Sequence, residues 1–111
     1  MIDYRERAKI VADDFSRLIG APGRGGILVH GQYSIYADGE HVVLDQYTAE
    51  GWVRIGTLTT NPTYYIGFID AGRIDVLAEH LADAMTRHGA LGPVRELRRI
   101  AKDDARRRQI G

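Results

Sequence analysis

The stretch YSIYADGEHVVL, residues 33–44, decides the fold because two segments of alternating side chains flank a turn within it. Alternate residues of a strand share one face, so Tyr33 and Ile35 lie on one face and the residues between and beside them lie on the other. Asp38-Gly39 is typical of a two-residue type I′ turn. Such a turn predicts the pairs Ile35–Val42 and Tyr33–Leu44 on the core face, and Tyr36–His41 and Ser34–Val43 on the other.

Further strands are predicted on both sides of this hairpin. The alternation extends upstream to Ile27, which predicts a first strand over Ile27–Tyr36. Downstream, TAEG at residues 48–51 forms the next turn, with Gly51 in a left-handed conformation before the strand Trp52–Leu58. A turn at Asn61-Pro62 leads to a strand over Tyr64–Ile69. Four consecutive strands joined by short turns predict an antiparallel meander.

Helical periodicity surrounds the meander. Residues Ile2–Ile19 carry apolar side chains within one arc, and Gly20 ends that helix. A second amphipathic helix runs from Ile74 to His88, with Gly89 as its stop, and Pro93 opens a final helix. The expected fold class is therefore α+β, with an N-terminal helix, a four-stranded antiparallel β-meander and two C-terminal helices in one compact domain, 1–111.

The composition is that of an ordinary globular protein and excludes several chemistries. The 111 residues are 44% hydrophobic and 27% charged. The absence of cysteine excludes disulfides, thiol nucleophiles and cysteine-ligated metals. No apolar run approaches the roughly 18 residues of a membrane span, and the charged first helix does not resemble a secretory signal. We expect a cytoplasmic protein with no membrane partner.

The glycine-rich run GAPGRGG, residues 20–26, resembles a phosphate-binding loop only superficially. After Gly25 it has Gly26 and Ile27 where a P-loop needs Lys and Ser or Thr. It also follows a helix, whereas phosphate loops lead into a helix N-terminus. We interpret the run as a helix stop and connection, with Arg24 as a possible partner contact.

No candidate catalytic, cofactor or metal residue emerges. His30, His41 and Asp45 share a predicted sheet face, but the two histidines lie more than about 15 Å apart at ~3.4 Å per residue. His80 and His88 belong to no zinc signature, and Glu79 with Asp83 on the same helix fits a solvated surface. Because no nucleophile motif is present either, we expect no cofactor and favour a non-enzymatic protein.

The final helix carries a basic stripe. From residue 93 onward there are seven basic and three acidic residues, a net charge of +4, so the rest of the chain carries −4. Such a stripe is a candidate contact for nucleic-acid phosphates or an acidic partner. The alternative is that its arginines are solvated or pair with the acidic remainder of the chain. The stripe comprises Arg95, Arg98, Arg99, Lys102 and Arg106.

A second candidate surface is aromatic. Tyr36, Tyr47 and Tyr65 are expected on the sheet face opposite the core, where tyrosines stack on bases or form subunit interfaces. The ordinary preference of tyrosine for strands explains them equally well. Trp52 is not assigned to a face, because Gly51 can introduce a bulge.

These observations lead to three functional hypotheses. The first is a protein–protein interaction module, such as a regulator, adaptor or phage-type accessory protein, that forms homo-oligomers through the tyrosine-bearing face or an edge strand. The alternative is nucleic-acid binding through the basic C-terminal helix. A small-molecule enzyme or sensor ranks lowest, because no convergent polar cluster is apparent.

Overall fold

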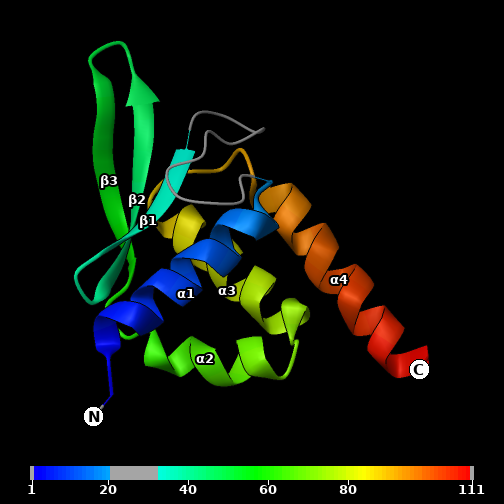
Figure 1. Cartoon of the computed structure of the whole chain (residues 1–111). Coiled ribbons are helices and arrows are strands. Elements are labelled where there is room, and N and C mark those ends of the chain that lie inside the picture. Colours follow the sequence, from blue (N-terminus) through cyan, green and yellow to red (C-terminus); the bar gives the residue numbers. More distant parts are fainter. Residues whose placement is uncertain (1, 21–32, 111) are drawn as a thin grey trace.

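The computed structural model describes residues 2–20 and 33–110 and shows an α+β fold (Figure 1). Two predicted features lie outside the described residues. They are the connection formed by the glycine run beyond Gly20 and the first part of the first predicted strand, residues 27–32. The elements are α1 (Tyr4–Leu18), β1 (Tyr33–Asp38), β2 (His41–Thr48), β3 (Gly51–Thr59), α2 (Thr63–Asp70), α3 (Ile74–Arg87) and α4 (Val94–Ile110).

The described strands form one antiparallel sheet in the order β1-β2-β3. Ile35 pairs with Leu44, so the predicted register, Ile35 with Val42, is wrong by two residues. The two-residue loop is Gly39-Glu40, with Gly39 at φ 63°, and among the described residues only glycines adopt positive φ. This is the position where a type II′ turn requires glycine. Because the side-chain period is two, the error leaves each residue on its predicted face.

The predicted fourth strand is wrong, because Thr63–Asp70 forms the helix α2. Four of its side chains pack against the core with the spacing of one helix face: Tyr65, Ile66, Phe68 and Ile69. A short apolar run fits a strand or a helix equally well, and here the buried surface of α1 beside it selects the helix. The consequence is a three-stranded described sheet and four helices rather than three.

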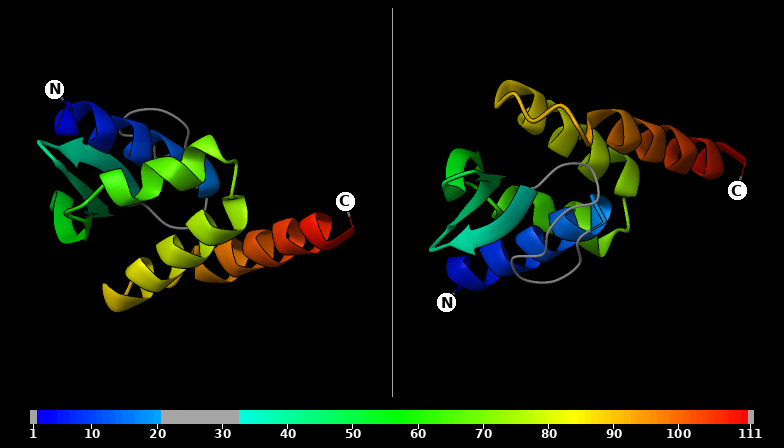
Figure 2. Two further views of the ribbon diagram at one scale, coloured as in Figure 1. Left: turned by 90° about the horizontal axis from the view of Figure 1, so that it is seen from below. Right: turned by 90° about the horizontal axis from the view of Figure 1, so that it is seen from above.

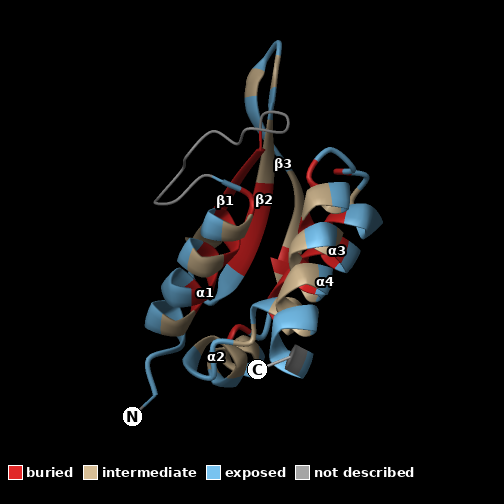
Figure 3. Cartoon of the chain, turned by 90° about the vertical axis from the view of Figure 1, so that its right-hand side faces the viewer, coloured by how far each residue is buried: buried red, intermediate tan, exposed pale blue. Residues whose placement is uncertain are grey.

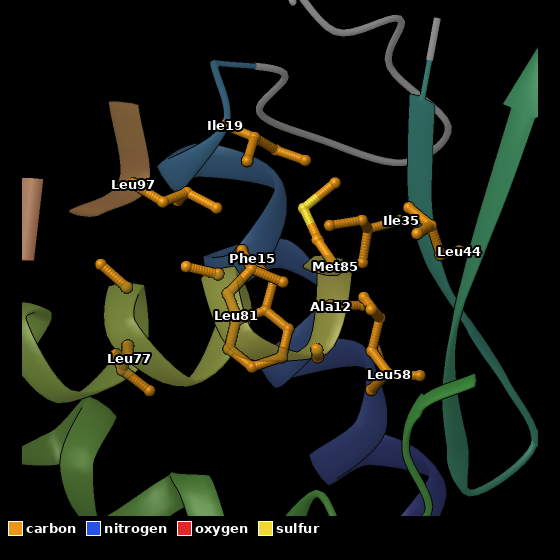
Figure 4. Packing of buried hydrophobic residues seen from close by; sticks show 14 of the residues in the cluster. Ala12, Phe15, Ile19, Ile35, Leu44, Leu58, Leu77, Leu81, Met85 and Leu97 are labelled. Carbon is orange, nitrogen blue, oxygen red and sulfur yellow. The ribbon is translucent and has the colours of Figure 1, made fainter. Parts of the chain in front are cut away.

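The core lies between the sheet and the helices α1 and α3, which both lie on the same side of the sheet (Figure 1). Ile35 and Leu44 point from the sheet toward Phe15 of α1 and toward Leu81 and Met85 of α3 (Figure 4). All five side chains are fully buried, and each such burial contributes about 1.5–3 kcal/mol. This core contains most of the predicted apolar faces of both helices and of the first hairpin, although Tyr4 and Ile74 at the helix starts are exposed. Ser34 and Val43, predicted on the opposite face of the sheet, are also buried.

The helices α3 and α4 lie side by side as an antiparallel pair, and the C-terminal end of α4 extends away from the sheet (Figure 2). Gly89 at φ 74° ends α3, and α4 begins directly after Pro93, as predicted. Leu97 and Ala101 supply the buried seam of α4. The rest of the helix is largely exposed, which leaves its basic side chains at the surface.

Candidate interaction surface

The face of the sheet away from α1 and α3 carries a group of aromatic and charged side chains. Tyr47 pairs with Trp52 and Asp45 with Arg54, and cross-strand partners share a face. Tyr36 and Asp38 of β1 lie on the same side by alternation. We call this group the outer sheet surface: Tyr36, Asp38, Asp45, Tyr47, Trp52 and Arg54.

Arg54 organises one half of the outer sheet surface. Its Nη2 donates to the Tyr36 hydroxyl at 2.9 Å, and its Nη1 lies 2.9 Å from Asp38 Oδ2. Its Nε lies 3.9 Å from Asp45 Oδ1, and the guanidinium carbon is 5.7 Å from the Tyr36 ring centroid. The Tyr36 hydrogen bond, followed by that of Asp38, raises the pKa of Arg54 above its usual range. The cation is thus held flat across the strands and balanced by neighbouring carboxylates.

The other half of the surface is an exposed aromatic pair. The rings of Tyr47 and Trp52 meet edge to face, with centroids 5.2 Å apart, while 49% and 41% of these residues remain exposed. Both lie on the β2–β3 hairpin, which extends beyond the helices (Figure 1). Figure 3 shows the far end of this hairpin as mostly exposed, in contrast to the buried middle of the sheet. Val53 beside them is also 41% exposed.

Trp52 lies on the same face as Tyr36 and Tyr47, which settles the assignment that the sequence left open. The bulges of β3 come after Arg54, so the segment next to the turn keeps a regular alternation. Gly51 adopts φ 101°, as predicted, and pairs with Thr48 at the turn.

Tyr65 does not lie on the sheet, so its predicted position on the outer sheet face is wrong. It lies on α2, where its ring meets Phe15 edge to face at 5.3 Å. Tyr64 and His80 contact the same ring at 5.1 and 5.7 Å. Burial raises the pKa of the Tyr65 phenol. Tyr65 is therefore a residue at the edge of the core, because the segment that carries it is helical.

The basic stripe of α4 is partly neutralised by ion pairs. Arg98 binds Glu79 and Asp83 of α3, the latter at 3.2 Å. Arg99 binds Glu96 and, at 2.9 Å, Asp103 on its own helix. These contacts correspond to the alternative in which the arginines pair with the acidic remainder. Within the described part of the chain, no ion pair involves the stripe's other members, Arg95, Lys102 and Arg106, which are exposed.

Each described histidine either contacts a neighbouring group of the protein or is exposed to solvent. His80 stacks on Tyr64 at 5.8 Å, His88 Nε2 lies 3.0 Å from the Thr57 carbonyl oxygen, and His41 is exposed at the start of β2. His30, the other member of the considered metal constellation, lies outside the described residues. Among residues 2–20 and 33–110, no group of three or more His, Asp or Glu side chains is placed to hold a metal ion.

A hollow of about 380 Å³ between α3 and α4 is lined in part by Asp75, Glu79 and His80. Asp75 and Glu79 are already paired with Arg73 and Arg98, and His80 stacks on Tyr64, so these groups do not converge on a free site. Another hollow, of about 570 Å³, lies between α1 and β1. Two charged side chains, Lys9 and Asp13, reach it beside apolar positions. A ligand site normally brings several polar groups together in a concave pocket. The outer sheet surface is therefore the feature of the described structure that we consider for function.

Comparison with protein-family models, with curated proteins and with solved structures found no match to this chain. None of the described helices has the length and apolar character required to span a membrane.

Proposed function

We propose that this protein is a non-enzymatic protein–protein interaction module that self-associates through its outer sheet surface. The observation that carries the proposal is the exposed Tyr47–Trp52 pair on a hairpin that projects beyond the helices. Trp, Tyr and Arg are the residue types that contribute most to binding energy at protein interfaces. Arg54 adds the third of these types to the same face.

The internal contacts of this surface also favour binding. Arg54 is held by Tyr36 and Asp38, and Tyr47 and Trp52 hold each other's rings. Side chains that are already ordered lose less conformational entropy when a partner arrives, a saving of about 0.5–1.5 kcal/mol for each one. The overall formal charge of zero removes net repulsion between copies of the chain.

Nucleic-acid binding through α4 has weaker support. Arg98 and Arg99 would have to exchange their carboxylate partners for phosphates, which offsets part of the gain from each phosphate contact. An enzyme or sensor has the weakest support, because the carboxylates that line the hollow between α3 and α4, Asp75 and Glu79, are already paired with Arg73 and Arg98.

The test is light scattering over a concentration series, combined with fluorescence. Trp52 is the sole tryptophan, so its emission reports on this surface directly. We expect the mass to rise with concentration and the Trp52 emission to shift to shorter wavelength as its ring becomes buried. Trp52→Ala should weaken association at least tenfold, as expected for a hot-spot residue.

The matched control is Tyr64→Ala, which removes a tyrosine that is 52% exposed on α2, away from the sheet. This variant should associate like the unmodified protein. A protein that stays monomeric at high concentration, with unchanged Trp52 emission, would contradict the proposal. An oligonucleotide complex that dissociates at high salt would instead support the role of α4.

A further inference from the structure

Among the described strands, none pairs with the outer edge of β3, next to the outer sheet surface. We infer that two copies of this chain associate by antiparallel pairing of β3 with β3, with the twofold axis passing between the two Val53 residues. The inference rests on the proposed self-association and specifies its contact. The two three-stranded sheets would then form one continuous sheet.

On each edge of the described sheet, one backbone carbonyl is contacted by a side chain from a helix or its cap. On β1, Ser16 of α1 donates its hydroxyl hydrogen to the Ile35 carbonyl oxygen at 3.1 Å, and both residues are buried. On the second half of β3, His88 of α3 lies 3.0 Å from the Thr57 carbonyl oxygen. Among the described residues, no helix makes a contact of this kind with residues 51–54 at the start of β3.

The register shows which backbone groups of this segment point outward. A two-residue loop is flanked by a hydrogen-bonded pair, here Thr48 and Gly51, and the pairs then alternate along an antiparallel ladder. The N–H and C=O groups of Val53 therefore point toward β2, and those of Trp52 and Arg54 point to the free edge. The same alternation places the Ile35 carbonyl on the outer edge of β1, where Ser16 binds it.

These outward groups are complementary to themselves. With the axis at Val53, Trp52 of one copy lies opposite Arg54 of the other, and each pair can exchange both of its N–H···O=C hydrogen bonds. Val53 then lies opposite Val53 as a non-hydrogen-bonded pair, in which side chains approach most closely. This pairing would cover a valine and a tryptophan that are each 41% exposed.

The edge lacks the features that normally prevent such pairing. Proteins protect free edges with charged side chains, above all lysine, and with proline or bulges. Residues 51–54 contain neither lysine nor proline, and the bulges of β3 lie further along the strand. The charge of Arg54 is directed across the sheet to Asp38 and Tyr36 of β1. Pairing would therefore bring no uncompensated charge against another.

Single-cysteine variants test this geometry, because the natural sequence contains no cysteine. In the proposed dimer, the Cα atoms at position 53 lie ~4.5 Å apart, within disulfide range. Val53→Cys should therefore form a covalent dimer under mild oxidation by oxidised glutathione, and a reductant should reverse it. Glu50→Cys at the hairpin turn is the exposed control, because its copies would lie about 20 Å apart at ~3.4 Å per residue.

Tyr47→Cys reports the competing arrangement in which two outer sheet surfaces meet face to face. In the edge-paired dimer the two copies of position 47 are separated by three strand spacings, about 14 Å, and cannot form a disulfide. Cross-linking of Val53→Cys alone supports edge pairing. Cross-linking of Tyr47→Cys without Val53→Cys overturns edge pairing and leaves the proposed function intact. Monomers in light scattering overturn both.

Amide hydrogen exchange on the unmodified protein provides a second readout that needs no substitution. Edge pairing should slow exchange of the Trp52 and Arg54 amides by at least tenfold between dilute and concentrated protein. The Val53 amide, which points toward β2, should change far less and serves as the internal control. A dimer in which the Trp52 and Arg54 amides exchange as fast as in the monomer would overturn the inference.

Discussion

The backbone N–H of Asp75 donates to the Oδ2 atom of Asp104, 29 residues away, at 2.9 Å. The N-cap residue of α3, Arg73, provides no side-chain cap, so a carboxylate from α4 takes that role. Arg108 holds the same Oδ2 atom at 2.9 Å and also binds the Gly72 carbonyl. This cap at the start of α3 exists only when α4 is docked, which couples the two helices.

Asp104→Ala should lower the free energy of unfolding by about 1–2 kcal/mol, because it removes a helix cap and an ion pair. Urea denaturation monitored by circular dichroism measures the effect. The control is Asp103→Ala, whose ion pair with Arg99 is exposed and should be worth less than about 0.5 kcal/mol. Equal losses in the two variants would contradict the capping role of Asp104.

The stability contribution of Asp75 should disappear at acidic pH. The hydrogen bond from Arg73 is the main cause that lowers the pKa of Asp75 below its usual value. A carboxyl group with a lowered folded-state pKa stabilises the fold above its unfolded value of about 3.9, and this contribution is lost as the pH falls through the folded pKa. Asp75→Asn should therefore melt below the unmodified protein near pH 7 and approach it near pH 2. A difference in melting temperature that is independent of pH would contradict this assignment.

Gly56→Ala should destabilise the fold by about 1–3 kcal/mol. A Cβ atom at position 56 would overlap the imidazole ring of His88, which is held by its contact with the Thr57 carbonyl. Gly67→Ala is the control, because a Cβ there meets open space within α2 and should stabilise the helix by about 0.5–1 kcal/mol. Adding His88→Ala to Gly56→Ala should recover part of the loss, and denaturation curves of the three variants check this order.

Arg98→Gln should reduce stability by less than about 1 kcal/mol, because its ion pairs with Glu79 and Asp83 are exposed. The difference should vanish near 1 M salt, where charges are screened within about 3 Å. Arg95→Gln makes the same change in charge at a position for which no described ion pair exists, and it should have no effect at either salt concentration. An Arg98 effect that persists at high salt would contradict this account.

Several parts of the candidate surface could be predicted from local pattern. The alternating pattern places Tyr36 and Tyr47 on the outer face. This placement does not depend on the error of two residues in the predicted hairpin register, because the side-chain period of a strand is two. Tyr65 could not be placed, because its short apolar segment forms a helix only through contact with α1. The role of Arg54 could not be predicted either, because its partners Asp38 and Tyr36 lie on β1, which β2 separates from β3.

The sequence by itself determined the features that depend on local periodicity and on glycine. These are the three helices α1, α3 and α4, the two hairpins with Gly39 and Gly51 at their turns, and the side of the sheet that faces the core. A helical or alternating pattern and a positive φ are properties of a few adjacent residues, so they can be recognised without a fold.

The tertiary structure alone decided the features that depend on contacts between distant segments. It placed Trp52 beside Tyr47, folded residues 63–70 as a helix, and brought Asp104 to the start of α3. It also balanced part of the basic stripe with carboxylates of α3. The physical reason is that ion pairs, caps and helix packing depend on which surfaces meet, and the amino-acid pattern of one segment does not contain that information.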